Sequence, residues 1–148
     1  MALNADRVGT VYPAFVYEVS REKIREYATA VGESDPRYFA DDDEMVAPPT
    51  FAACFSIGNA LRTVLDDPQL GAHPRLVHGS QSFTYGDRPM RPGDVLRCEP
   101  SIVSITPRGD NEFLVIALEA TFVSDETLAA RAESTIVFLG SANGSDAG

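Results

Sequence analysis

The sequence contains few residues of the kinds on which many functional sites depend. It has only two cysteines, Cys54 and Cys98, and two histidines among 148 residues. The cysteines form no Cys-x-x-Cys pair, and no histidine lies near either of them at metal-ligand spacing. The sequence therefore predicts neither a disulfide framework nor a metal site, and we expect both thiols to be buried.

Basic side chains and long apolar runs are also scarce. Twelve lysines and arginines stand against 22 aspartates and glutamates, a formal net charge of −10 that repels nucleic acid. The apolar run over 113–117 is far shorter than the roughly 18 to 20 residues that span a bilayer. The N-terminus lacks the basic and then apolar pattern of a signal peptide. We expect a cytoplasmic protein that binds neither nucleic acid nor membrane.

The remaining composition is that of an ordinary globular protein. Hydrophobic residues make up 44% of the chain and charged residues 23%, and the length fits one domain with a real core. We expect a single domain over residues 1–140. The small and polar residues over 141–148 predict a flexible tail.

The first half of the chain predicts two helices separated by a loop. Alternating apolar residues over 14–19 predict a short strand, and Ser20 and Gly32 are typical of the two ends of a helix over 21–31. The proline-rich and acidic stretch over 32–49 predicts an irregular loop, where we expect the chemistry. A second helix is predicted over 50–65, capped by Thr50 and enclosed on most sides. Gly58 within it is expected to permit a close approach of backbone or ligand.

The second half predicts a sheet. Segments 76–86, 95–106, 112–124 and 128–139 have the pattern of long strands and are separated by turn residues, which implies antiparallel pairing. A largely apolar helix that precedes such a sheet is enclosed if the sheet curls around it. The predicted fold class is α+β, a hot dog fold with a long central helix wrapped by a curved antiparallel sheet. A second chain would cover the open edge of this sheet.

Four strings of residues stand in a characteristic order along the chain. They read YEVSREKIREYA (17–28), AVGESDP (30–36), VAPPTF (46–51) and VHGSQSFTY (77–85), the last followed by RPGD (91–94). In this order they resemble the MaoC-like hot dog dehydratases over about residues 3–139. The closest resemblance is to the substrate-holding, non-catalytic-type subunit of actinobacterial (3R)-hydroxyacyl-ACP or -CoA dehydratases, with its FAS1-like dehydratase N-terminal domain.

The resemblance implies a reaction, but this sequence differs from the family at the catalytic motif. It implies interconversion of (3R)-3-hydroxyacyl and trans-2-enoyl thioesters by general acid–base chemistry, without metal or cofactor. Catalytic members carry an Asp and a His in a loop of the form Gly-Asp-x-Asn-Pro-x-His. Here Glu33 falls on the Asp and Tyr38 on the His. A phenol, with a reference pKa near 10, is a poor base at neutral pH, so the catalytic pair is incomplete.

The resemblance therefore implies one half of an enzyme of fatty-acid metabolism. The chain would be the substrate-holding subunit of a hydro-lyase, with the Asp/His pair supplied by a partner hot dog chain. Two other functions remain open. One is a self-sufficient homodimeric (R)-specific enoyl-CoA hydratase that uses Glu33 with Tyr38 or His78, and the other is a non-catalytic module that binds acyl thioesters.

Candidate binding residues follow from the same resemblance. Those expected to hold the substrate are Pro48, Pro49, Thr50, Phe51, Phe55, Asn59 and His78. Those expected to dock the phosphates of coenzyme A or acyl carrier protein are Arg75, Arg88 and Arg91. Simpler roles also fit: core packing for the phenylalanines, exposure for Asn59, a structural role for His78 on an alternating strand, and solubility for the arginines. His73 is expected to be a solvated loop residue.

Overall fold

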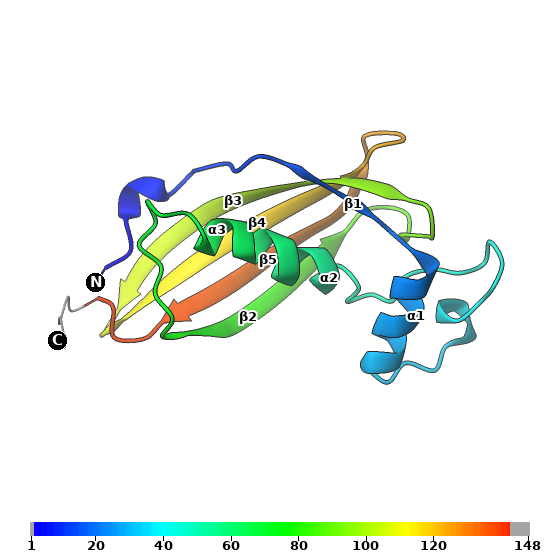
Figure 1. The fold of residues 1–148 in the computed structure, drawn as a ribbon, viewed down its shortest axis with the longest axis horizontal. Coiled ribbons are helices and arrows are strands. Elements are labelled where there is room, and N and C mark those ends of the chain that lie inside the picture. The colour runs from blue at the N-terminus through cyan, green and yellow to red at the C-terminus, as the bar shows by residue number, and fades with distance from the viewer. Residues whose placement is uncertain (1, 143–148) are drawn as a thin grey trace.

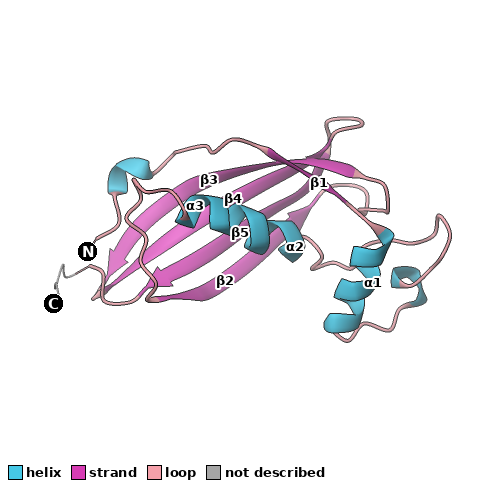
Figure 2. Ribbon diagram, viewed as in Figure 1, coloured by secondary structure: helices cyan, strands magenta, loops and turns pink. Residues whose placement is uncertain are grey.

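The computed structural model describes residues 2–142, which form an antiparallel sheet with a helix across one face (Figures 1 and 2). The five strands are β1 (Phe15–Glu18), β2 (Leu76–Tyr85), β3 (Val95–Arg108), β4 (Asn111–Phe122) and β5 (Leu128–Phe138). Their spatial order is β1-β3-β4-β5-β2, which places β1 and β2 at the two edges. The predicted α+β class and the antiparallel sheet are confirmed.

The first helix, α1 (Arg21–Ala30), lies beyond one end of the sheet (Figure 1). As predicted, the Ser20 hydroxyl accepts a hydrogen bond from the Lys23 amide at 3.1 Å at its start. Gly32 follows its C-terminal end with a φ of +77°, a conformation that favours glycine. Short 3₁₀ helices lie at Ala5–Arg7 and Pro36–Tyr38. No helix within residues 2–142 is long and apolar enough to cross a membrane.

The central helix has three parts. They are α2 (Ala53–Phe55), a π-helical segment (Ser56–Ala60) and α3 (Leu61–Leu65). The predicted cap at Thr50 is wrong, because the N-cap residue is Ala52, which makes no side-chain capping bond. Residues 48–52 instead form tight turns, and the Thr50 hydroxyl accepts a hydrogen bond from the Tyr27 hydroxyl at 2.8 Å. Thr50 therefore links α1 to the segment that leads into the central helix.

The prediction that this helix is enclosed on most sides is wrong for the isolated chain. The sheet covers one face, where Phe55 and Ala60 are buried, whereas Ile57 is 36% exposed and Asn59 is exposed. A Cβ atom added to Gly58 would meet no atom within 4 Å, so the expected close approach does not occur within the described chain. A helix that lies on a single sheet buries only the stripe that faces it.

Two apolar clusters fill the space between the helix and the sheet. The cluster nearer α1 contains Phe51, Phe55, Leu96, Leu118 and Phe122, and the cluster around α3 contains Val64, Leu70, Leu114, Ile136 and Phe138. All ten side chains are at most 2% exposed. Inward-facing residues of β4 and β5 contribute to both clusters, which makes these two strands the base on which the helix packs.

Strand β2 does not alternate regularly, contrary to the prediction. Its register with β5 shifts between His78 and Ser80, which marks a bulge. Leu76 and Phe83 both pack on the core, although strict alternation would place them on opposite faces. An extra residue in one strand reverses which side chains face inward beyond it. His78 itself is exposed.

The N-terminal segment passes along the edge of the sheet beside β3 (Figure 1), an arrangement that no sequence pattern indicated. Val11 forms an isolated bridge with Ser101. Asp67, just after α3, accepts hydrogen bonds from the Tyr12 hydroxyl and from Arg7, both at 2.7 Å. The bond from Tyr12, followed by those from the Gln69 amide and from Arg7, holds the pKa of Asp67 below its usual value.

This network predicts a stability effect that depends on pH. Because the pKa of Asp67 is lowered by folding, its charge stabilises the fold above the unfolded-state pKa, near 4, and this contribution is lost as the pH falls through the folded-state pKa. Asp67→Asn should lower the free energy of unfolding by about 1 kcal/mol at pH 7. The difference from wild type, measured by urea denaturation, should shrink below about pH 4. A difference independent of pH would contradict the assignment.

The end of the chain is ordered further than expected. The Ser141 hydroxyl donates a hydrogen bond to the Phe138 carbonyl at 3.3 Å, and the Ala142 amide donates one to the Asp110 carbonyl at 3.1 Å. The packed chain therefore continues two residues beyond the predicted domain boundary. The remainder of the predicted tail, 143–148, lies outside the described residues.

Candidate functional site

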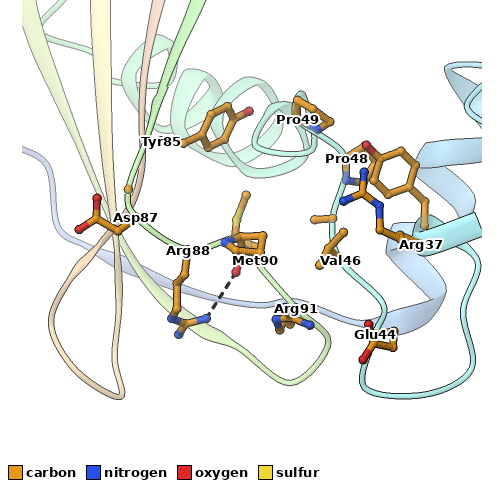
Figure 3. Close-up of a pocket in the computed structure, with 14 residues that line it drawn as sticks. Arg37, Glu44, Val46, Pro48, Pro49, Tyr85, Asp87, Arg88, Met90 and Arg91 are labelled. Atoms are coloured by element: carbon orange, nitrogen blue, oxygen red, sulfur yellow. Dashed lines mark hydrogen bonds between the residues drawn. The ribbon is translucent and has the colours of Figure 1, made fainter. Parts of the chain in front are cut away.

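A pocket of about 500 Å³ lies between the loop after α1 and the segment after β2 (Figure 3). The first side is formed by Arg37, Tyr38, Glu44, Val46, Ala47, Pro48 and Pro49. The second is formed by Tyr85, Gly86, Asp87, Arg88, Pro89, Met90 and Arg91. The Ala47 amide donates a hydrogen bond to the Met90 carbonyl at 2.8 Å, which joins the two sides. The loop in which we expected the chemistry thus supplies half of the lining.

A short turn positions Tyr38 in the first side. Asp35 precedes the 3₁₀ helix and its carboxylate accepts a bond from the Arg37 amide at 2.9 Å. The Arg37 guanidinium also binds this carboxylate, at 2.8 Å from Nη2, and these bonds hold the pKa of Asp35 below its usual value. The Arg37 carbonyl accepts a bond from the Val46 amide at 3.1 Å, which fixes the turn to the later part of the loop.

Arg88 is held rigidly in the second side. Its guanidinium binds both carboxylate oxygens of Asp94, at 3.1 and 3.2 Å, and lies 3.4 Å from the centroid of the Phe122 ring. Asp94 also accepts a bond from the Arg91 amide at 2.7 Å. The turn over residues 91–94, with Gly93 at a φ of +90°, therefore orients the carboxylate that holds Arg88.

Within the described chain, two of the three arginines that line the pocket form ion pairs with carboxylates, and the third does not. Arg37 is paired with Asp35, and Arg88 with Asp94. The Arg91 guanidinium instead binds the Asp43 carbonyl at 2.8 Å, and within residues 2–142 it has no carboxylate at ion-pair distance. Since Arg91 is exposed at the mouth, its charge is the one best placed to attract an anionic group of a ligand.

Apart from the carboxylates of Glu44 and Asp87, the rest of the lining is apolar or neutral. Figure 3 shows Val46, Pro48 and Pro49 across from Tyr85 and Met90. Burial raises the pKa of Tyr85 to about 12, so its hydroxyl is neutral at physiological pH. The pocket can therefore hold an apolar chain between these residues while polar groups of the same ligand reach the arginines.

The pocket brings together some of the candidate residues from the sequence. Pro48, Pro49, Arg88 and Arg91 line it, as does Tyr38. Phe51 and Phe55 lie fully buried in the core behind it. Asn59 lies in a separate hollow with Phe15, Val16, Arg62, Thr63 and Asp66, next to the exposed side of the central helix.

Other candidates lie far from the pocket. Arg75 precedes β2 whereas Arg88 follows it, so the length of a ten-residue strand, roughly 30 Å, separates them. His78 is exposed on β2, with Nε2 3.1 Å from Gln81 Oε1. His73 is not solvated as predicted, because Nδ1 accepts a bond from the Arg75 amide, the ring packs 5.1 Å from that of Phe138, and Nε2 is buried.

Glu33 lies outside the pocket. It is exposed just after α1, and its amide donates to the Ala28 carbonyl at 2.9 Å as part of the helix end. Tyr38, by contrast, is 8% exposed and belongs to the lining. Glu33 and Tyr38, which align with the Asp and His of the catalytic motif, therefore lie in different environments, one in solvent and the other in the pocket wall.

Several residues of the lining were missed from sequence, among them Arg37, Tyr85 and Met90. Arg37 could have been predicted, because it immediately precedes the candidate Tyr38. No sequence pattern indicated Tyr85 and Met90, because they line the pocket only when the end of β2 lies beside the loop after α1. Within residues 2–142 no cluster of histidine, cysteine, aspartate and glutamate could hold a metal ion. Burial raises the pKa of Cys98 to about 12 and also raises that of Cys54, which is only half-buried, so neither thiol is activated.

A central helix on a five-stranded antiparallel sheet defines this protein as an α+β hot dog domain. A family model described as the FAS1-like, dehydratase domain region matches residues 6–131, and the chain belongs to this family. A UPF0336 protein of Saccharopolyspora erythraea is 38% identical over 96% of this chain and 95% of the relative. UPF0336 protein SCO4636 of Streptomyces coelicolor is 44% identical over 78% of this chain and 82% of the relative.

Solved structures of similar fold agree with the hot dog assignment. The C-terminally truncated HadBC complex of Mycobacterium tuberculosis, a 3R-hydroxyacyl-ACP dehydratase, superposes with a TM-score of 0.76 and 26% identity over 89% of this chain and 97% of that chain. A MaoC-like dehydratase gives a TM-score of 0.77 at 24% identity, over 92% of this chain and 43% of that chain, and shows the fold alone.

Proposed function

We propose that the chain is the substrate-holding subunit of a (3R)-3-hydroxyacyl thioester dehydratase, or enoyl hydratase, in cytoplasmic fatty-acid metabolism. Its family is that of FAS1-like dehydratase domains, and the similar HadBC complex is a 3R-hydroxyacyl-ACP dehydratase. In this proposal the pocket of this chain holds the acyl thioester. The acid–base pair comes from a partner hot dog chain.

The observation that carries the proposal is a formed pocket without the histidine of an acid–base pair. Within residues 2–142 the lining contains no histidine, since His73 and His78 both lie elsewhere. Glu33 does not line the pocket, and the motif position that does line it is occupied by Tyr38. The reaction needs a group that titrates near neutral pH beside the substrate. A binding role for this chain and a catalytic role for another chain fit this arrangement.

The free edge of the sheet supports a partner chain. Within residues 2–142 strand β2 pairs only with β5, so its other edge leaves backbone N–H and C=O groups without strand partners there. Val77 and Tyr85 on this strand are 47% and 38% exposed. HadBC and the ChsH1–ChsH2 pair, both similar in fold, are complexes of two chains. Edge pairing through β2 would place the partner next to the pocket, because Tyr85 lines it.

The carrier would approach from the pocket mouth. Arg91 offers an unpaired positive charge there, and Arg88 lies on the same side. Coenzyme A and acyl carrier protein both present phosphate groups to such a site. Arg75 would contribute only through a different contact, because it lies at the far end of β2.

The proposal is tested by following hydration of a trans-2-enoyl-CoA through its loss of ultraviolet absorbance. The purified chain alone should show no turnover, whereas the chain co-purified with a catalytic-type hot dog partner should be active. In the pair, Glu33→Gln should leave kcat within about twofold, because Glu33 lies outside the pocket. The partner alone and heat-inactivated pair serve as controls.

Two outcomes would replace the proposal. Turnover by the isolated chain that Glu33→Gln abolishes would identify a self-sufficient hydratase. Saturable acyl-CoA binding without hydration in any pairing would identify a binding module.

A further inference from the structure

We infer that Tyr38 determines specificity by binding an oxygen on the acyl chain, so that the pocket selects 3-hydroxyacyl over saturated acyl thioesters. This inference rests on the proposed function. It concerns a residue that the acid–base chemistry does not require.

The ring of Tyr38 is fixed in place before any ligand binds. It is 8% exposed and packs within the core cluster that also contains Met45 and Met90. Its amide donates to the Asp35 carbonyl at 3.1 Å, and the preceding Arg37 is held by Asp35 and by Val46. A hydroxyl on so constrained a ring loses little conformational entropy when it forms a hydrogen bond.

The hydroxyl of Tyr38 has no hydrogen-bond partner among residues 2–142. Buried side-chain oxygen and nitrogen atoms without a partner in this part of the chain are Ser56 Oγ and His73 Nε2. The Tyr38 hydroxyl is not among them, so it reaches accessible space, and the space that Tyr38 lines is the pocket. A polar atom at the edge of a core that lacks a protein partner is available to a ligand.

The surroundings indicate what kind of ligand group it meets. The neighbouring Arg37 is already bound to Asp35, and the apolar residues Val46 and Pro48 lie on the same side. An anionic group would be drawn instead to Arg91 at the mouth. The Tyr38 hydroxyl therefore meets the chain portion of the ligand, and because it can both donate and accept, it suits an alcohol, which can do the same.

A saturated chain would leave this hydroxyl without a partner on the ligand. A site built to hydrogen-bond a substrate hydroxyl discriminates against the analogue that lacks it, since the polar group of the protein is then left unpaired. We expect (3R)-3-hydroxyoctanoyl-CoA to bind about tenfold more tightly than octanoyl-CoA, as for one net hydrogen bond.

The experiment compares Kd values of the two thioesters by isothermal titration calorimetry on the full chain. Tyr38→Phe should remove the preference by weakening only the hydroxyacyl thioester, to the affinity of octanoyl-CoA. Tyr85→Phe is the matched control, because it deletes another pocket hydroxyl, and any change in affinity that it causes should be shared by both thioesters, so that their Kd ratio stays at the wild-type value. The Tm of Tyr38→Phe should equal that of wild type, since the deleted hydroxyl makes no bond within the described chain.

The possible failures can be told apart. If the wild type binds both thioesters equally, or if Tyr38→Phe keeps the preference, the role of Tyr38 is refuted while acyl binding stands. If the wild type binds neither thioester, the proposed function fails, and the inference fails with it.

Discussion

Replacing Gly86 by alanine should destabilise the protein by about 3 kcal/mol, which lowers Tm by roughly 10 °C in a domain of this size. A Cβ at this position would lie 1.8 Å from the Leu128 carbonyl oxygen and 2.8 Å from its carbon. These are backbone atoms, so no side-chain rotation relieves the overlap. The end of β2 would have to separate from the start of β5, which breaks the bond from the Gly86 amide to the Ala129 carbonyl.

The matched control is Gly58→Ala in the central helix. No atom lies within 4 Å of its added Cβ, and alanine is favoured over glycine in a helix by about 0.5 to 1 kcal/mol. This variant should therefore keep or raise Tm, as measured by circular dichroism on both proteins in parallel. Equal melting of Gly86→Ala and wild type would show that the two strands do not approach so closely. Because Gly86 also lines the pocket, acyl-CoA binding by Gly86→Ala should fall together with its stability.

Replacing Phe55 by alanine should cost about 4 kcal/mol of unfolding free energy, measured by urea denaturation. The Phe55 side chain is completely buried, and its ring centroid lies 4.9 Å from that of Tyr17. Tyr17 is half-buried against the same cluster, and this burial raises its pKa to about 12. The alanine variant leaves a cavity between the central helix and the sheet that the surrounding strands cannot close.

Two further variants separate packing from binding at this position. Phe39→Ala removes the same side chain at a site that is 36% exposed and should change stability by less than about 0.5 kcal/mol. Phe55→Leu should retain most of the stability. Since Phe55 does not line the pocket, this variant should bind acyl-CoA within about twofold of wild type. A large loss of affinity with retained stability would instead make Phe55 a wall of the acyl site.

Local signals along the chain determined the main elements. Ser20 and Gly32 mark the two ends of α1 as predicted, because helix capping depends on residues within a few positions of each other. The strand patterns of β3, β4 and β5 agree with the structure within two residues at either end, because inward-facing residues alternate over much of each strand. The order of one helix before a set of antiparallel strands then leaves few arrangements other than a helix packed on a sheet.

The candidate site was predicted only in part, and for a clear reason. Tyr38, Pro48 and Pro49 lie in one loop, so a sequence motif could identify them together. Arg88 and Arg91 were candidates because of their charge, but charge alone could not separate them from Arg75, which lies at the other end of β2. Their relation to the loop arises from pairing between distant parts of the chain.

The sequence by itself determined the fold class, the central helix and the absence of a histidine from the loop after α1, because each depends on residue identity or local period. The tertiary structure alone decided which side chains share the pocket and which face of the helix stays exposed. It also reversed the faces of β2 through the bulge after His78, and it brought the N-terminal segment to Asp67. These features depend on contacts between residues far apart in the chain, which no local pattern encodes.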